Sequence, residues 1–382
     1  MKEREYYADV MSFKKRSRLF WDSLFIVLFI SVSVAFTYPE ILFKRPQGVH
    51  VWRQTDCTSL ALNYYQKDLP LLRPQMHHRF QGDSEAMGEF PIMYFLVGKL
   101  YSVFGYHEFI YRGIWWLISF AGSFCLYRLA YNLLNLPMES VLIGLILILS
   151  PVNAFYGISF IADPVAMYFV CIALYLLHQA YKSGIYYYYL PGIGIIALSG
   201  LLKISSLIIP ISLISVFVLY CLLNRKWREF FFALTALFII GFVNYSWYNY
   251  AIEFNRARNN FYFFTRTAPI WEIGSQERTE LFKLFYDIRL QEFYNKLMWL
   301  VGIILGVLGF YKLRKNPWWT LFIFTGVVGV ISFFLLFFQQ FRYHDYYMIN
   351  LVMIVPMLFL FGFRVIRDLN LNQKVVFVLR FF

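Results

Sequence analysis

Long, unbroken apolar runs constrain the fold of this chain more than any other feature of its sequence. Each run is roughly 17 to 25 residues long, the length that an α-helix needs to cross about 30 Å of hydrocarbon. Because 60% of the residues are hydrophobic and only 15% are charged, an ordinary soluble domain is excluded. We therefore predict an all-α polytopic membrane protein in which residues 1–382 form a single membrane domain, with no soluble domain. About ten spans are predicted, near residues 19–38, 110–134, 139–157, 164–181, 186–202, 204–223, 229–251, 297–312, 317–338 and 346–364.

Basic residues predict how these spans are oriented. A basic cluster at 14–18 precedes the first run, which lacks a small-residue cleavage site, so we predict a retained first helix with a cytoplasmic N-terminus. Alternation then places two long loops, about 39–108 and 252–296, on the outer face. We expect a bacterial inner membrane, with both loops on its periplasmic or outer side. The same alternation puts short basic hinges inside, at Lys182, 225–228, 312–315 and 364–367.

Charge and metal-type spacings argue against several other classes of protein. The net charge of +13 comes partly from the inner hinges, and an anionic membrane surface accounts for it, so nucleic acid is not an expected partner. Cys57 is alone in a loop and the other three cysteines lie in apolar runs, so no disulfide framework or zinc spacing is present. The adjacent His77 and His78 are more typical of a solvated loop than of a metal site. No glycine-rich phosphate loop is found, and no nucleotide cofactor is expected.

The first outer loop carries a dense group of chemically capable side chains. It reads His50-Val-Trp52-Arg53-Gln54-Thr-Asp56 and, further on, Gly88-Glu89-Phe-Pro91. Arg53 and Asp56 are three residues apart, so on a short helix they share a face, where they could bind a ligand or form a simple surface ion pair. A second helix is predicted from Phe90 to Phe104. Both helices would lie at the membrane interface and hold Asp56 and Glu89 there.

Further polar groups fall at the same predicted face. Asp163 precedes Pro164, Lys203 separates two apolar runs, and His344-Asp345-Tyr346 precedes the last run. Ionisable groups at membrane depth are costly and therefore indicate function. Simpler interpretations are that Asp163 caps a helix, that Lys203 reaches up to the lipid headgroups, and that His344 and Asp345 belong to an interfacial belt.

Taken in order, these motifs resemble the GT-C glycosyltransferases, and in particular the branch of the protein O-mannosyltransferases and the lipid A aminoarabinose transferase. The similarity runs from His50 to about Pro356. It implies a bundle of membrane helices with two interfacial helices in the first outer loop, and sugar donors carried on polyprenyl phosphate such as undecaprenyl phosphate. It also implies inversion at the anomeric carbon. Cys57 stands where the protein mannosyltransferases have the second acid of an Asp-Glu pair, which leaves the acceptor open.

The resemblance implies a role for each candidate residue. Asp56 matches the general base, Glu89 a second acid near the reacting groups, and Lys203 a residue near the donor phosphate, where Arg53 could join it. Glu89 and His344 are the residues that could hold a divalent metal ion. The expected substrate-binding residues are His50, Trp52, Gln54, Asp163, His344, Asp345 and Tyr346.

We therefore expect an inverting glycosyltransferase that moves a sugar from a polyprenyl-phosphate carrier to a hydroxyl of a lipid, glycan or protein at the outer face. Trp271, Glu272, Glu277 and Arg278 of the second outer loop would cover the cavity. The alternatives are a lipid or sugar transporter or flippase, and a glycan polymerase or ligase that uses pyrophosphate-linked donors. A transporter is typically built from broken helices with charges deep in several spans, a pattern that is not seen here.

Overall fold

The computed structural model describes residues 2–77, 84–260, 262–263 and 267–368, with side chains described from residue 18 onward. These residues are almost entirely helices and turns. In the described part of the chain, strand-type pairing is limited to an isolated bridge between Gln75 and Glu85. The predicted all-α class is confirmed.

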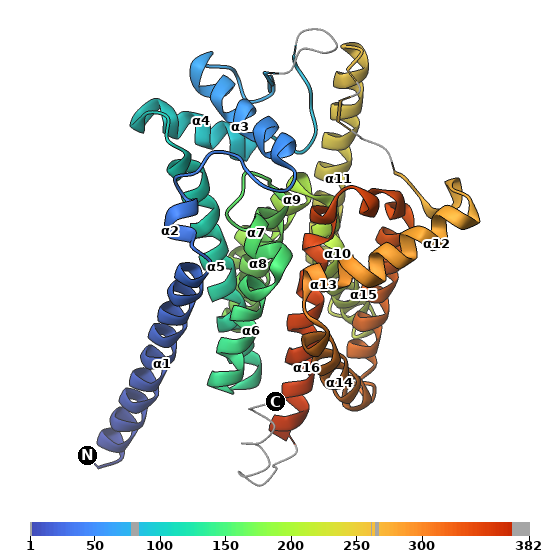
Figure 1. The fold of residues 1–382 in the computed structure, drawn as a ribbon. Helices are drawn as coiled ribbons and strands as arrows, with labels where there is room; N and C mark the ends of the chain where they lie inside the picture. Colours follow the sequence, from blue (N-terminus) through green and yellow to red (C-terminus); the bar gives the residue numbers. More distant parts are fainter. Residues whose placement is uncertain (1, 78–83, 261, 264–266, 369–382) are drawn as a thin grey trace.

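Among the described residues, eight helical segments are long and apolar enough to cross a membrane, so the chain is an integral membrane protein. They pack side by side as a bundle (Figure 1). They are α1 (Lys2–Ala35, apolar from Arg18), α5 (Glu108–Leu134), α8 (Asp163–Ser183), η2 with α10 (Ile204–Leu207 and Ile208–Leu223), α11 (Trp227–Ala257), α14 (Lys296–Leu313), α15 (Pro317–Leu336) and η6 with α16 (Asp345–Met353 and Ile354–Asp368).

The two remaining predicted spans are shorter apolar helices. One is α9 (Tyr189–Leu202), which follows the 3₁₀ turn η1 (Tyr186–Tyr188). The other, expected as one helix over 139–157, is broken at Ser150 into α6 (Pro137–Leu149) and α7 (Pro151–Tyr156). Ser150 has extended backbone angles, φ −67° and ψ 124°. The break follows from Pro151, because proline lacks an N–H and pushes the preceding residue out of the helical region.

The two helices predicted in the first long loop are α3 (Val51–Gln66) and α4 (Ile92–Phe104). They lie across one end of the bundle, after the short helix α2 (Tyr38–Ile41) (Figure 1). Gly98 lets them touch: a Cβ at this position would lie 2.6 Å from the Cβ of Tyr64 and 2.9 Å from the carbonyl oxygen of Ala61. Close contact between the helices therefore requires glycine here.

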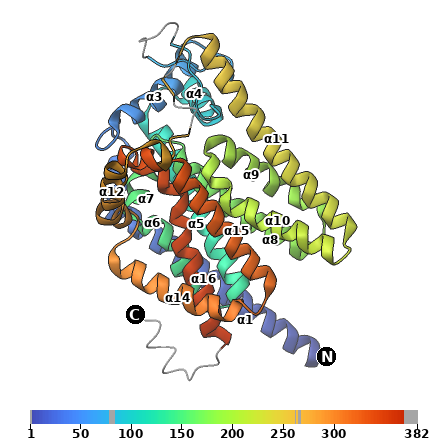
Figure 2. The ribbon, with the colours of Figure 1, turned by 90° about the vertical axis from the view of Figure 1, so that its right-hand side faces the viewer.

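The opposite end of the bundle is the basic end. The start of α1 and the last turn of α16 lie there (Figures 1 and 2). Lys312, in the last turn of α14, forms an ion pair of 2.9 Å with Asp368, and Arg367 donates to the carbonyl of Leu133 at 3.0 Å. Two of the hinges that the sequence placed on one side of the membrane, 312–315 and 364–367, thus share one end of the molecule with the start of α1.

The second long loop contains several short helices packed beside the bundle. Phe282 contacts Phe338 with ring centres 4.9 Å apart, and Glu277 pairs with Arg342 at 3.1 Å. The loop is thereby fixed to the turn that precedes η6. Its elements are η3 (Ile270–Glu272), α12 (Ser275–Leu284), the π turn η4 (Phe285–Arg289) and α13 (Leu290–Phe293), and the contacted turn is η5 (Phe338–Arg342).

One apolar core joins the crossing helices to the bundle. Its buried side chains come from α3, α4, α5, α8, η6 and α16, and include Leu60, Tyr94, Trp115, Val165, Ile349 and Val355. Close packing of this kind holds the polar residues of α3 in a fixed position relative to those of the membrane helices.

Candidate active site

The start of α3 is held by a tight turn. His50 precedes the helix with a left-handed backbone, φ 52° and ψ 37°. The buried side-chain amide of Gln54 donates to the carbonyls of Gln47 and Val49, both at 2.9 Å. These bonds satisfy the carbonyl groups of the turn, so Gln54 has a structural part in fixing His50 and Arg53. Its predicted contact with substrate is untested.

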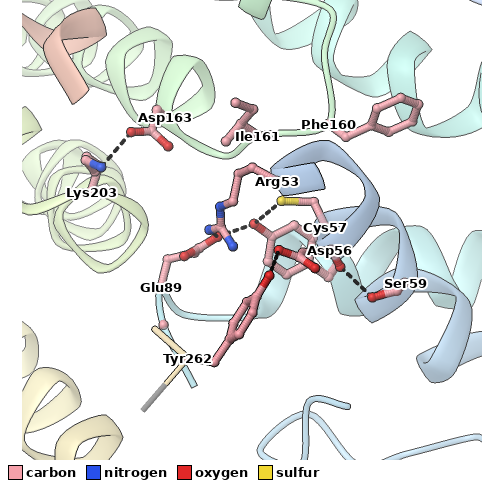
Figure 3. Close-up of polar contacts among 12 residues, drawn as sticks. Arg53, Asp56, Cys57, Ser59, Glu89, Phe160, Ile161, Asp163, Lys203 and Tyr262 are labelled. Atoms are coloured by element: carbon pink, nitrogen blue, oxygen red, sulfur yellow. Dashed lines mark hydrogen bonds and ion pairs between the residues drawn. The ribbon is translucent and has the colours of Figure 1, made fainter. Parts of the chain in front are cut away.

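Arg53 and Glu89 form a buried ion pair between α3 and the segment before α4, with Nη2 2.5 Å from Oε1 (Figure 3). The hydroxyl of Tyr94 also donates to Glu89 Oε1. Burial alone would raise the pKa of Glu89, but the charge of Arg53 and the Tyr94 hydrogen bond together hold it below its usual value. Arg53 Nη1 is buried and has no hydrogen-bond partner among the described residues. A guanidinium with an unused, buried donor is suited to an anion.

A second buried ion pair joins two membrane helices at the same end. Lys203 Nζ lies 2.7 Å from Asp163 Oδ1 (Figure 3). It also lies over the ring of Tyr347, 3.6 Å from its centre. Lys203 follows α9 and Asp163 begins α8. Ala162 occupies the N-cap position of α8, and no side-chain cap is present. Asp163 is therefore the partner of Lys203 rather than a helix cap, and the ammonium group points to this carboxylate.

The residues around His344 form a third group, at the start of η6. His50 Nε2 lies 3.2 Å from Asp345 Oδ1, which also accepts from the Tyr156 hydroxyl at 2.7 Å. The ring of His344 lies 5.7 Å from that of His50. Burial, followed by the charges of His50 and nearby cations, lowers the pKa of His344 to about 4, so it is neutral near pH 7.

Aromatic rings surround this third group. Trp52 lies 6.0 Å from the His344 ring and remains half exposed, whereas Tyr346 is buried and 5.1 Å from His50. Flat rings beside polar groups are suited to packing on the apolar face of a sugar or on an isoprenoid chain.

Asp56 lies on α3 one turn from Arg53 and is contacted from the second long loop. The hydroxyl of Tyr262 donates to Asp56 Oδ2 at 2.7 Å (Figure 3). Phe263, the next residue, places its ring 5.0 Å from the guanidinium carbon of Arg53. The structure thus brings the predicted site residues of five chain segments to one end of the bundle, and adds the side chains after α11 to them.

Several of these contacts were not predicted. Tyr94, Tyr156, Tyr262 and Phe263 each touch a candidate residue. The chain contains 30 tyrosines and 43 phenylalanines, and spacing does not separate these four from the rest. The only sequence signal for them is proximity to a predicted outer loop.

Some predicted residues lie elsewhere. Trp271 and Glu272 are exposed, whereas Glu277 forms an ion pair with Arg342 that fixes the loop to η5. Arg278 donates to the carbonyl of Ile273 at 2.9 Å, within the same loop. The cover over Asp56 and Arg53 comes instead from the residues after α11. His77 is exposed, and His78 lies outside the described residues.

For a metal ion, the described residues offer no group of three His, Cys, Asp or Glu side chains. Glu89 and His344, the suggested ligands, face other partners: Glu89 is bonded to Arg53 and Tyr94, and His344 packs among aromatic rings. Among the described residues, Glu89 and His344 are therefore not part of a three-ligand group.

Comparison with solved structures finds a similar fold. The chain superposes on the crystal structure of ArnT from Cupriavidus metallidurans bound to undecaprenyl phosphate with a TM-score of 0.60, over 93% of this chain and 62% of that one. It has a GT-C-like fold. The predicted fold is thereby confirmed; with 15% sequence identity, the similarity speaks for the fold alone. No family model and no curated protein sequence matches the chain.

Proposed function

We propose that the protein is an inverting glycosyltransferase that moves a sugar from a polyprenyl-phosphate carrier to a hydroxyl of a lipid, glycan or protein at the outer face of the membrane. The observation that carries this proposal is the convergence at one end of a GT-C-like bundle of a carboxylate, Asp56, with two buried cations, Arg53 and Lys203. The ArnT structure is bound to undecaprenyl phosphate, which supports the same class of carrier here.

The bond changes follow from this arrangement. The acceptor oxygen attacks the anomeric carbon while the carboxylate of Asp56 takes its proton. The bond between that carbon and the phosphate oxygen breaks, and its electron pair stays on the polyprenyl phosphate. Attack from the face opposite to the leaving group inverts the configuration at the anomeric carbon.

Charge develops on the leaving phosphate during this step. Arg53 carries a buried N–H donor at Nη1 without a partner among the described side chains, and Lys203 supplies a second cation. Buried cations stabilise such a charge strongly because little water screens them. Glu89 holds Arg53 in orientation through Nη2. The aromatic group of His50, Trp52, His344 and Tyr346 is suited to the sugar, and we place the donor sugar there.

The test is the variant Asp56→Asn. We expect it to insert and fold normally and to lose transfer by at least about 100-fold, the contribution of a general base. Release of polyprenyl phosphate from a purified polyprenyl-phosphate sugar, with membrane extract as acceptor, measures the reaction. Asp68→Asn is the matched control, because that carboxylate is 85% exposed and, among the described residues, pairs with the exposed Lys99.

Near-normal turnover of Asp56→Asn would remove Asp56 from the role of base. The mass added to the acceptor decides between enzyme classes: a single sugar unit supports the proposal. Transfer of a whole oligosaccharide from a pyrophosphate-linked donor would make the protein a polymerase or ligase instead.

A further inference from the structure

In the described part of the second long loop, the hydroxyl of Tyr262 contacts the carboxylate of Asp56 at 2.7 Å. We propose that Tyr262 is a positioning residue: it binds Asp56 Oδ2 and so turns the carboxylate for proton transfer from the acceptor. This inference rests on the proposed function, in which Asp56 is the base. It assigns to the segment after α11 a part in the reaction itself.

The contact with Tyr262 bears on the orientation of the Asp56 carboxylate. The backbone of Asp56 is fixed within α3, where its carbonyl accepts from Ser59 Oγ at 2.8 Å. That bond involves only the backbone of Asp56. A phenol hydroxyl that donates to one carboxylate oxygen restricts the side-chain torsions, because a hydrogen bond has a preferred direction.

Tyr262 is itself held by a network rooted in the first long loop. Its backbone N–H donates to Asn260 Oδ1 at 3.0 Å, and Asn260 Nδ2 donates to the carbonyl of Glu85 at 2.9 Å. The carboxylate of Glu85, which is 1% exposed, binds Arg258 at 2.8 Å and Arg73 at 2.5 Å. These bonds hold the backbone of Tyr262 within reach of Asp56, as an orienting group requires.

The same network positions Glu89. Asn255, near the end of α11, exchanges two hydrogen bonds with the backbone of Met87: it accepts from the N–H at 2.8 Å and donates to the carbonyl at 2.7 Å. Phe90 N–H donates to the carbonyl of Leu201 at 2.9 Å. Glu89 lies between these two anchors. The same hydrogen-bond network thus places Tyr262 beside Asp56 and Glu89 beside Arg53.

The charged and titratable groups near Asp56 determine how loss of the Tyr262 hydroxyl changes the pH dependence of the reaction. Arg53 and Cys57 face Asp56 from α3. Glu89, in the segment before α4, and Tyr94 of α4 lie beyond them. A hydrogen bond donated to a carboxylate favours its charged form. Its removal makes protonation easier, so the acidic limb of the pH–rate profile moves to higher pH.

The first test is Tyr262→Phe, which removes one oxygen atom. We expect kcat to fall about tenfold, the scale of one hydrogen bond to a charged group, with the donor KM unchanged. We also expect the acidic limb of the kcat/KM profile to move to higher pH. Tyr286→Phe is the control, because its ring is 71% exposed on η4. Wild-type kcat and an unmoved acidic limb in Tyr262→Phe would overturn the proposal.

A second measurement needs no turnover. With 3-fluorotyrosine placed at position 262, the ¹⁹F signal should shift as the bonded carboxylate is protonated between about pH 3 and 7, and this step should vanish in Asp56→Asn. A step that persists in Asp56→Asn, or its absence with native Asp56, overturns the contact. If the step is present but the wild-type protein releases no polyprenyl phosphate, the proposed function fails and the positioning role falls with it, while the contact stands.

Discussion

At the scale of single residues, the candidate site is built from cations that already have anionic partners. Arg53 pairs with Glu89, and Lys203 pairs with Asp163. Pairing lowers the cost of burying each charge, and breaking a pair by removing one member leaves the other buried and uncompensated. In the proposed reaction, the donor phosphate therefore shares each cation with a carboxylate, and this sharing would favour release of the product carrier after transfer.

Lys203→Ala tests this sharing. We expect the apparent KM for the donor to rise at least about tenfold and the folded state to lose about 3–5 kcal/mol, because Asp163 is then buried without its cation. Donor kinetics and thermal unfolding in detergent measure the two effects.

The double variant Lys203→Ala with Asp163→Asn separates stability from binding. The double variant should regain most of the stability that Lys203→Ala loses, but its affinity for the donor should stay as low as in Lys203→Ala. Donor binding at the wild-type level in the double variant would contradict the assignment of Lys203 to the phosphate.

At the scale of helices, glycine decides which faces can meet. A Cβ on Gly309 of α14 would lie 2.6 Å from the Cβ of Phe361 and 2.7 Å from its backbone carbonyl carbon, on α16. A methyl group cannot be accommodated there unless the two helices separate, because backbone atoms cannot turn away as the end of a long side chain can.

Gly309→Ala should therefore lower the free energy of unfolding by about 1–3 kcal/mol, the usual cost of overpacking. Gly194→Ala, in α9, is the matched control, because nothing lies within 4 Å of a Cβ at that position. Since alanine favours helix over glycine, the control should be neutral or slightly stabilising. Thermal unfolding in detergent compares them, and equal stability of the two variants would contradict the packing argument.

The link between the first long loop and the segment after α11 should depend on pH. Burial would raise the pKa of Glu85, but hydrogen bonds and charge from Arg73 and Arg258 hold it below its usual value. A carboxyl with a lowered folded pKa contributes stability above its unfolded pKa of about 4.3 and loses it as the pH falls through the folded value.

In Glu85→Gln, the free energy of unfolding at neutral pH should consequently be about 3 kcal/mol lower than in wild type. On acidification, the variant should lose less stability than the wild-type protein does. The unfolding temperature measured between about pH 3 and 7 checks both expectations. Glu272→Gln, at an exposed position, is the control and should follow the wild-type curve. Parallel acid curves for Glu85→Gln and wild type would exclude Glu85 as the titrating group.

At the scale of the whole molecule, the two ends of the bundle differ in chemistry. The crossing helices α3 and α4, with the candidate site, occupy one end, and the start of α1 and the last turn of α16 occupy the other (Figures 1 and 2). The basic hinges at 312–315 and 364–367 lie at that second end, where Lys312 pairs with Asp368. Basic loops stay in the cytoplasm, so we propose that the site faces outward.

Cysteine labelling in intact cells tests this orientation. Gln66→Cys, at the exposed end of α3, should react with a membrane-impermeant maleimide, whereas the exposed Lys315→Cys should react only after permeabilisation. The native cysteines give a low background, because Cys57, Cys171 and Cys221 are buried and Cys125 is partly buried. The opposite pattern would reverse the orientation and place the site in the cytoplasm.

The sequence by itself determined the class of fold and most of the elements. A helix that crosses hydrocarbon must satisfy its backbone internally and present apolar side chains, so its signal is local and can be read from composition over about 20 residues. The helices α3 and α4 could be predicted for the same reason. So could the positions of Asp163, which is next to Pro164, and of Lys203, which lies between two apolar runs. The break at Ser150 was the local feature missed, although Pro151 signalled it.

The tertiary structure alone decided which polar groups meet. Asp163 and Lys203 are 40 positions apart, and Asp56 and Tyr262 are separated by 206. Such pairs depend on how helices pack, and packing follows the shapes of many side chains together rather than any spacing along the chain. For this reason a tyrosine among 30 could be recognised as the partner of Asp56 only after the bundle had assembled.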